Sequence, residues 1–257
     1  MTIKFIILGS GSSMGVPRAD GHSGNCDLKN LKNHRSRCSA LIKFNEENFL
    51  IDTSPDLRQQ MISNKIRSIS KVFYTHMHAD QTHGINDLRP FYITKKKKLP
   101  VYANDATSKY LYSTFKYCFK STSGYPSTLN LNILKKKHTF KNKNKKILLQ
   151  AIPVKHGKIE SLCYIVNKKL AYAPDTSLFY KKDLKLLKNL SFFVIDCLWY
   201  KNHPAHFNLD QVLDLVKIIN PKRTILTNMH SDIDFNSIKK KLPKNVVPGF
   251  DGMTLKL

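Results

Sequence analysis

The sequence predicts an α/β protein in which β-sheets pack together and helices cover their outer faces. Two observations lead to this prediction. Short apolar runs alternate with polar loops and with segments of helical periodicity along the whole chain. Strand pairs dominate the first quarter of the chain, whereas strands and helices mix later. Because each sheet must bury its apolar face against another layer, we expect sheet packed on sheet with helices outside.

The strand candidates are short apolar runs bounded by polar turns. They are residues 3–8, 38–43, 47–52, 71–75, 99–102, 147–154, 161–167, 170–173, 191–196, 223–228 and 252–257. Helices are predicted at 54–64, 80–93, 105–119, 178–189, 208–219 and 234–241. Asn208 is followed three positions later by Gln211, which resembles a capping box at the start of one of these helices. Residues 121–146 have the least regular pattern.

Length and composition indicate a globular protein. A chain of 257 residues with 41% hydrophobic residues can bury a sizeable core, and we expect a single domain over 1–257. No run reaches the roughly 18 apolar residues that a membrane span needs, so no membrane partner is expected. Ile3 to Leu8 leads directly into Gly9, which indicates a first strand rather than a signal peptide and predicts a cytoplasmic protein. The 5 cysteines lack CxxC spacing, which argues against a disulfide framework.

The net charge of +25 raises the question of a nucleic-acid partner. Lys outnumbers Arg by 36 to 7, and much of the excess lies in Lys95–Lys98 and Lys135–Lys146. Phosphate and base readers usually use Arg forks as well. We therefore interpret these tracts as solvated loops, and attraction for anionic substrates, RNA included, is the alternative.

The most informative segment is residues 75–83, Thr-His-Met-His-Ala-Asp-Gln-Thr-His. It follows the apolar strand candidate 71–75 and brings three histidines and a carboxylate close together in sequence. A turn after a strand can direct such side chains toward one point, where imidazole and carboxylate groups bind a metal ion.

Residues of metal-ligand type recur at the ends of other apolar runs. They are His156, Asp175, His203, His206 and His230. Each alone would usually be a surface histidine, a core histidine or a turn carboxylate. Together they suggest one rim of loops on a rigid scaffold, which is where functional residues concentrate.

The ordered motifs His-x-His-x-Asp, His, Asp and His resemble the metallo-β-lactamase superfamily. The resemblance includes the loop Leu8–Arg18, the segment Ile51–Ser54 and the segment Tyr172–Thr176. These look like the branch that contains phosphoribosyl 1,2-cyclic phosphate phosphodiesterase. The resemblance implies an αββα sandwich, with two mixed β-sheets flanked by helices and metals at one edge between the sheets.

The resemblance also implies the roles of the site residues. His76, His78 and His156 would hold a first metal, Asp175 would bridge, and Asp80 and His230 would hold a second metal. The metals would be Zn²⁺ or Mn²⁺. His206 is the expected proton donor and, with Asp80, a catalytic residue. The expected function is a metal-dependent phosphodiesterase that cleaves a small cyclic or diester phosphate by attack of a metal-bound hydroxide.

One ligand position departs from the family, because Gln81 stands where histidine is usual. An amide is a weaker ligand than imidazole. Three outcomes follow: a second site of lower affinity that takes Mn²⁺ or Fe²⁺, a second site completed by His83, or a mononuclear enzyme. We favour the weakened two-metal site.

Several other residues have both a functional and an ordinary interpretation. Asp52 and Asp196 could orient ligand histidines or be turn carboxylates. Arg89 could bind a substrate phosphate or pack at a helix end. His203 is the less favoured proton donor. His22 and Cys26 lie where relatives can carry a structural zinc site, but two ligands do not close one.

Two other functions are alternatives. The first is a tRNA 3′-processing endonuclease of the tRNase Z type, but such nucleases often insert a long arm where only 18 residues separate His156 from Asp175. They also usually have Gly where Ala79 stands. The second is a non-catalytic binding protein on the same scaffold, which only Gln81 supports. A homo-oligomer is left open.

Overall fold

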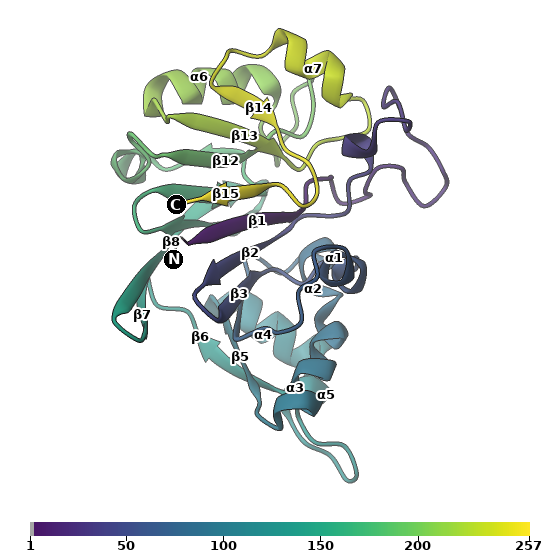
Figure 1. Ribbon diagram of the computed structural model, residues 1–257, viewed down its shortest axis with the longest axis vertical. Coiled ribbons are helices and arrows are strands. Elements are labelled where there is room, and N and C mark those ends of the chain that lie inside the picture. The colour runs from purple at the N-terminus through teal and green to yellow at the C-terminus, as the bar shows by residue number, and fades with distance from the viewer. Residues whose placement is uncertain (1–2) are drawn as a thin grey trace.

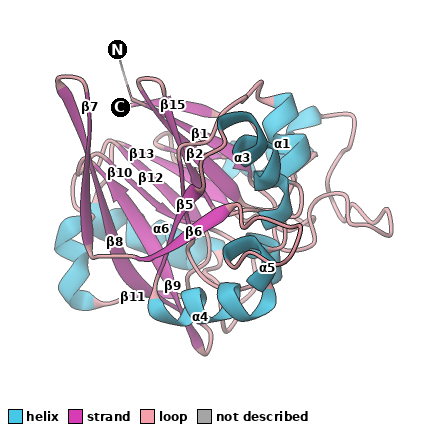
Figure 2. Ribbon diagram, turned by 90° about the horizontal axis from the view of Figure 1, so that it is seen from below, coloured by secondary structure: helices cyan, strands magenta, loops and turns pink. Residues whose placement is uncertain are grey.

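The computed structural model describes residues 3–257 and contains two β-sheets packed face to face, with helices on both outer faces (Figure 1). Figure 2 shows the strands in the middle of the molecule and the helices around them. Residues 1–2 of the predicted domain lie outside the described part of the chain. The predicted sandwich of two mixed sheets flanked by helices is confirmed.

The first sheet is mixed. Its order is β15 (Thr254–Lys256), β1 (Lys4–Gly9), β2 (Ser39–Phe44), β3 (Glu47–Ile51), β4 (Lys71–Phe73), β5 (Leu99–Ala103) and β6 (Leu129–Ile133). The strands from β15 to β3 pair antiparallel, and those from β3 to β6 pair parallel. The parallel half carries the 75–83 segment at the end of β4.

The second sheet is also mixed. Its order is β11 (Leu178–Phe179), β8 (Lys145–His156), β9 (Ile159–Val166), β10 (Leu170–Ala173), β12 (Phe192–Asp196), β13 (Arg223–Thr227) and β14 (Val246–Pro248), and β7 (Lys137–Asn142) pairs with β8. Strands β10, β12, β13 and β14 run parallel, so their carboxyl ends share one edge of the sheet.

The helices divide between the two outer faces. Those near the first sheet are α1 (Leu57–Ser63), α2 (Ala79–Thr82), η2 (Ile85–Leu88), α3 (Arg89–Lys95), α4 (Asp105–Thr114) and α5 (Lys116–Phe119). The others are η1 (Leu31–Asn33), η3 (Lys181–Leu186), α6 (Leu209–Ile219) and α7 (Phe235–Lys241). The predicted capping box of α6 forms, since Asn208 and Gln211 exchange both hydrogen bonds.

Three hydrophobic clusters correspond to the three interfaces between layers. The inner cluster joins the sheets and includes Phe5 and Phe73 from the first sheet and Tyr164 and Tyr172 from the second. A second cluster lies between the second sheet and α6, and a third lies between the first sheet and helices α1 and α4. Burial of apolar area at these interfaces is the main stabilising contribution to the fold.

The predicted helix over 80–93 is divided into α2, η2 and α3. The break lies at Gly84, whose backbone N–H donates to Thr53 O at 2.9 Å. A Cβ at Gly84 would lie 2.0 Å from Ser54 O, so only glycine allows the two segments to come this close. The division fixes the 75–83 segment against the loop that follows β3.

Two other predictions need correction. The segment 178–189 is not an α-helix, because Leu178 and Phe179 pair with β8 and the 3-10 helix η3 follows. The irregular segment 121–146 contains β6 and β7. The tract Lys135–Lys146 is therefore a hairpin arm rather than a loop, and its lysines are exposed as expected. Within residues 3–257, no helix is long and apolar enough to cross a membrane.

Candidate metal centre and active site

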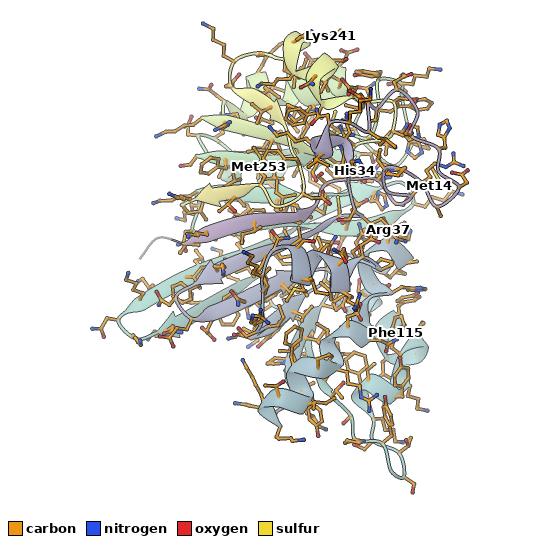
Figure 3. The ribbon with its side chains drawn as sticks, turned by 45° about the vertical axis from the view of Figure 1, so that its right-hand side comes forward. Met14, His34, Arg37, Phe115, Lys241 and Met253 are labelled. Carbon is orange, nitrogen blue, oxygen red and sulfur yellow. The ribbon has the colours of Figure 1, made fainter. Side chains whose placement is uncertain are left out.

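The candidate residues meet at one edge of the sandwich because each follows the end of a strand. His76 follows β4, His156 ends β8, Asp175 follows β10, Asp196 ends β12 and His230 follows β13. The long loop between β1 and β2 lies at the same edge, since Gly11 pairs with Met229. This loop extends to the right in Figure 1, and Figure 3 labels its residues Met14, His34 and Arg37. The structure thus brings together residues from both sheets.

Three imidazole groups converge at the centre of this edge. His76 Nε2 lies 3.1 Å from His78 Nδ1, and His156 Nε2 lies 3.2 Å from the same atom. The ligand nitrogens of all three lie within 4.8 Å of one another. Ligands in a tetrahedral site at about 2.0–2.1 Å from an ion are about 3.3 Å apart, so the three nitrogens fit the corners of such a site.

The hydrogen bonds of two rings direct their lone pairs to this point. His156 Nδ1 lies 2.8 Å from Ala205 O, which only accepts, so Nδ1 carries the proton and Nε2 the lone pair. Thr75 Oγ1 donates to Asp52 Oδ2 at 2.9 Å and lies 3.0 Å from His76 Nδ1. His76 Nδ1 is therefore also the protonated nitrogen, and Asp52 contacts this ring through the Thr75 hydroxyl.

Burial favours the neutral forms of His76 and His156. It lowers the pKa of His156 to about 4, and it lowers the pKa of the fully buried His76 well below its ordinary value. The neighbouring histidines lower both further, because a charged ring would repel them. Neutral imidazole is the form that binds a metal ion.

Asp175 lies beside His156 and His206 and is held from both sides. Gln81 Nε2 donates to its Oδ2 at 2.7 Å, and Asn228 Nδ2 donates to its Oδ1 at 3.1 Å. A ligand oxygen of Asp175 lies within 4.8 Å of the ring nitrogens of His156 and His206. Burial, followed by the nearby Asp80 carboxylate, raises the pKa of Asp175.

His206 is paired with a buried carboxylate. Its Nδ1 lies 2.7 Å from Asp196 Oδ2, which also accepts the backbone N–H of Thr176 at 2.9 Å. Burial lowers the pKa of His206, but Asp196, Asp175 and Asp80 outweigh this and raise it to about 9. Asp196 therefore orients His206 and stabilises its protonated form.

Asp80 and His230 line the same cavity, but they do not belong to the group of three convergent histidines. His230 Nδ1 lies 3.2 Å from the backbone N of Asp232, and its ring centroid is 5.2 Å from that of Trp199. Burial raises the pKa of Asp80. Among the described residues, ligand atoms of Asp80, Asp175 and His230 do not converge as those of the three histidines do.

These side chains surround a cavity of about 450 Å³. Its lining is Ser12, Ser13, Met14, His78, Asp80, His156, Asp175, Leu198, Trp199, His203, Ala205, His206, Asn228 and His230. The volume lies in the range of small-molecule sites, about 300–1,000 Å³. The cavity is polar on the histidine side and has Leu198 and Trp199 as its apolar part.

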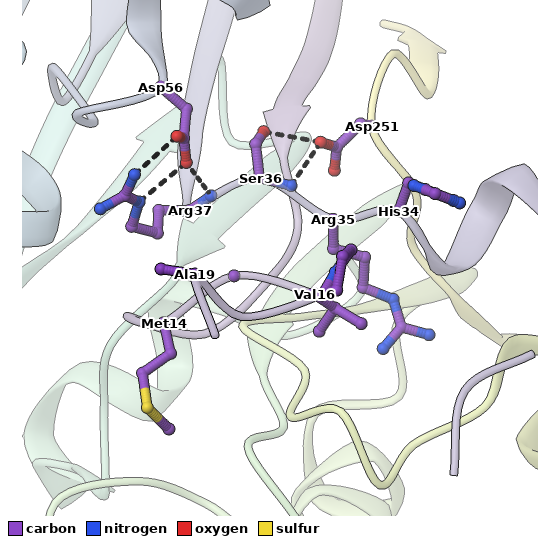
Figure 4. Close-up of a pocket in the computed structure, with 11 residues that line it drawn as sticks. Met14, Val16, Ala19, His34, Arg35, Ser36, Arg37, Asp56 and Asp251 are labelled. Carbon is purple, nitrogen blue, oxygen red and sulfur yellow. Dashed lines mark hydrogen bonds and ion pairs between the residues drawn. The ribbon is translucent and has the colours of Figure 1, made fainter. Parts of the chain in front are cut away.

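A second cavity of about 440 Å³ shares Met14 with the first (Figure 4). Both carboxylates in its lining accept hydrogen bonds from neighbouring lining residues. Arg37 donates to both oxygens of Asp56, at 2.8 and 2.6 Å, and Ser36 donates twice to Asp251, at 2.7 and 2.6 Å. This cavity holds none of the candidate metal ligands.

The remaining candidates lie outside the centre or at its margin. His83 Nε2 contacts Tyr110 Oη at 3.1 Å, so His83 does not complete the metal set. The Arg89 guanidinium lies 4.7 Å from the centroid of the Tyr125 ring, away from the cavity. His203 is exposed at the cavity rim.

The loop that carries His22 and Cys26 packs against the segment around Ile233. Cys26 Sγ lies 3.4 Å from Ile233 O. No group of three metal-ligand side chains within residues 3–257 includes Cys26 or His22.

Several other residues that contact the candidate ligands were not predicted from the sequence. Asn228 contacts Asp175, Asp196 Oδ1 at 3.3 Å and His206 Nδ1 at 3.2 Å, and Thr75 and Ala205 O hold two of the histidines. Their positions in the sequence could have identified them, since Asn228 and Thr75 each stand within two residues of a predicted ligand. Asn228 also has a left-handed backbone with φ 59°, which Asn tolerates better than most residues.

Comparison with known proteins agrees with this architecture. The model of the Beta-lactamase superfamily domain matches residues 47–229. A protein of Porphyromonas gingivalis (strain ATCC BAA-308 / W83) named Octanoyltransferase is 29% identical over 254 residues, which are 98% of this chain and 51% of that protein. The chain thus spans about half the length of this curated relative.

Solved structures with the same fold cover nearly the whole chain. A new diphosphatase from the PhnP family has a TM-score of 0.89 at 28% identity, with 100% of this chain and 98% of that one covered. Zn²⁺-bound PqqB from Methylobacterium extorquens has a TM-score of 0.78 at 15% identity, with coverages of 99% and 100%. Human tRNase Z, short form, has a TM-score of 0.68 at 15% identity, with 98% of each chain covered. The chain belongs to the β-lactamase superfamily, as a metallo-β-lactamase-fold hydrolase of the PhnP-like branch.

Proposed function

We propose that this protein is a metal-dependent phosphohydrolase that cleaves a phosphodiester or diphosphate linkage in a small substrate. The observation that carries the proposal is the placement of three convergent imidazoles next to the His206–Asp196 pair in one cavity. Metal ligands next to a positioned proton donor are what hydrolysis of such a linkage requires. The ligands come from both halves of the chain, so we infer that one domain carries the whole site.

The proposed ligands are His76, His78 and His156, with Asp175 beside them. Asp80, Asp175 and His230 are the residues available to a second ion. A divalent ion bound here would lower the pKa of water and neutralise charge that develops on a phosphoryl group. The Nδ1 bonds of His76 and His156 hold both rings ready for this role.

His206 is proposed to protonate the leaving group. It lines the cavity next to His156, with ring centroids 4.7 Å apart, and Asp196 fixes its Nδ1. With Nδ1 engaged, Nε2 is the nitrogen free to donate a proton. A leaving alkoxide or phosphate accepts that proton as the bond to phosphorus breaks.

The substrate class rests on the cavity and on one relative. The cavity suits a small molecule. The PhnP-family relative at 28% identity is a diphosphatase, which supports a phosphorus-containing substrate. The interval between His156 and Asp175 holds only β9 and β10, so it has no room for an RNA-gripping arm. The activity named for the Porphyromonas protein belongs to a chain about twice as long.

A hydrolysis screen with Zn²⁺- or Mn²⁺-loaded protein tests the proposal. The panel contains bis(p-nitrophenyl) phosphate, a 2′,3′-cyclic nucleotide, a ribosyl cyclic phosphate, a nucleoside diphosphate sugar, a thioester and a pre-tRNA. We expect turnover of one or more small phosphorus compounds and none after His156→Ala. Absence of phosphoryl hydrolysis with either metal would overturn the proposal, and selective cleavage of pre-tRNA would favour the nuclease alternative.

A further inference from the structure

We propose that Gln81 makes the metal centre asymmetric. One ion is held tightly on His76, His78 and His156, and Gln81 positions Asp175 instead of supplying a ligand for a second tightly held ion. The inference rests on the proposed metal-dependent function and specifies how that centre is built.

Gln81 is buried behind the wall of the cavity. It lies in α2 directly after Asp80, is fully buried and is absent from the cavity lining. Its backbone carbonyl accepts the N–H of Thr53 at 2.8 Å, which ties this part of α2 to the loop after β3. Gln81 therefore lies behind Asp175 as seen from the cavity.

The amide of Gln81 directs its NH₂ group toward Asp175. Gln81 Nε2 donates to Asp175 Oδ2 at 2.7 Å, so the NH₂ end of the amide, which has no lone pair to offer a cation, faces Asp175, while the buried Oε1 has no hydrogen-bond partner among the described residues. Asn228 Nδ2 holds the other oxygen of Asp175. With a donor on each oxygen, the carboxylate is fixed in one orientation, beside His156 and His206. A hydrogen-bonded ligating carboxylate is a recurrent feature of metal sites.

His230 differs from His76 and His156 in the nitrogen that carries its proton. The backbone N–H of Asp232 donates to its Nδ1 at 3.2 Å, so the neutral ring carries its proton on Nε2. Asp232 Oδ2 could favour the opposite tautomer by accepting a proton from Nδ1. However, it is 3.5 Å from Nδ1 and already accepts the Nε1–H of Trp199 at 2.8 Å. His230 thus presents an N–H donor, which suits a substrate oxygen better than a metal ion.

The two halves of the centre therefore differ. His76 and His156 hold their protons on Nδ1 and direct the lone pair of Nε2 inward. His230 instead accepts a hydrogen bond at Nδ1 and holds its proton on Nε2. A second ion would need a new tautomer of His230, and at position 81 it would find an amide NH₂ group in place of an imidazole lone pair. Both features oppose its binding.

Metal counting after reconstitution tests this inference without any substrate. The protein is stripped with a chelator, loaded with Zn²⁺ or Mn²⁺, passed through gel filtration and analysed by mass spectrometry. We expect one ion per wild-type chain. Gln81→His supplies an imidazole in place of the amide, and we expect it to retain two. Gln81→Ala should retain one ion with affinity about 10–100-fold lower, since Asp175 loses an orienting donor.

Gln59→Ala is the matched control, because Gln59 is exposed on α1 and bonds only Ser63 there. Its metal content should equal that of the wild type, and melting temperatures verify that each variant is folded. Two ions retained by the wild type, no ion retained, or a Gln81→Ala affinity equal to that of the control would overturn the inference. One retained ion without any hydrolysis would instead overturn the proposed function alone.

Discussion

Asp196 Oδ2 lies 2.7 Å from His206 Nδ1, and both groups are withdrawn from solvent, with side-chain exposures of 0% and 14%. The same carboxylate accepts the backbone N–H of Thr176, so it cannot turn away from the ring. This pair links the end of β12 to the cavity. It sets both the direction of the imidazole and the pH range in which it is charged.

The first prediction is a pH dependence of turnover. The pKa of His206 is raised to about 9, so the proton donor is present below that pH and is lost as pH rises through it. We expect kcat/KM to fall above about pH 9. Asp196→Asn removes the strongest of the charges that raise this pKa, so the fall should move to lower pH by about one unit or more. Profiles of kcat/KM against pH for both proteins measure the shift.

A surface change provides the control for this prediction. Asp214→Asn breaks an exposed pair with Lys217 and should leave the profile unchanged. A p-nitrophenyl leaving group needs little protonation, so its hydrolysis should depend less on His206. An identical alkaline fall in wild type and Asp196→Asn would show that His206 is not the group that titrates.

The second prediction concerns Thr75. Its hydroxyl connects the buried Asp52 carboxylate to His76 Nδ1. Thr75→Val removes this connection at nearly constant volume, and we expect metal affinity to fall about 10–100-fold. Thr75→Ser keeps the hydroxyl and should bind metal like the wild type. Competition with a chromophoric chelator measures the affinities, and equal values for the Val and Ser variants would contradict the prediction.

The strand-end histidines could be predicted because an apolar run followed by a ligand motif is a local pattern. The contacts that orient them are not local. Ala205 O reaches His156 over 49 positions, and Asn228 reaches Asp175 over 53. No periodicity in the sequence encodes such pairs. The same holds for Gln81, whose position in the motif was evident but whose bond to Asp175 spans 94 positions.

The fold shows a similar division. The long apolar strands were predicted because burial on both faces leaves continuous apolar runs. Strand β7 was missed because its half-buried positions are His138, Phe140 and Asn142, and only Phe140 among them is apolar. The predicted helix at 178–189 failed because pairing of Leu178 and Phe179 with β8 overrode the local periodicity.

The third prediction concerns stability. Arg35 is buried and donates to Ile233 O at 2.6 Å and to Asn33 Oδ1 at 3.0 Å. Arg35→Met would remove both of these charge-assisted hydrogen bonds from a buried position, and we expect the free energy of unfolding to fall by about 1–3 kcal/mol. Urea unfolding measures the change. Arg18→Met removes a solvent-exposed ion pair and should change stability by less than about 0.5 kcal/mol. Equal stabilities of the two variants would contradict the role of Arg35.

The fourth prediction concerns Asp251, which accepts hydrogen bonds from the backbone and hydroxyl of both Ser10 and Ser36. Burial outweighs these donors and raises its pKa to about 6. Between the unfolded value of about 3.9 and this value, the folded state binds more protons than the unfolded state. The free energy of unfolding that Asp251 contributes should therefore fall as pH rises from about 4 to 7.

Asp251→Asn isolates this contribution because the amide does not titrate. Urea unfolding of both proteins at several pH values gives the difference in their free energies of unfolding. We expect the wild type to lose up to about 2–3 kcal/mol relative to Asp251→Asn between pH 4 and 7. The constant effect of the replaced hydrogen bonds cancels from this change with pH. A difference that is independent of pH, or that grows in favour of the wild type, would show that the four donors outweigh burial at this carboxylate.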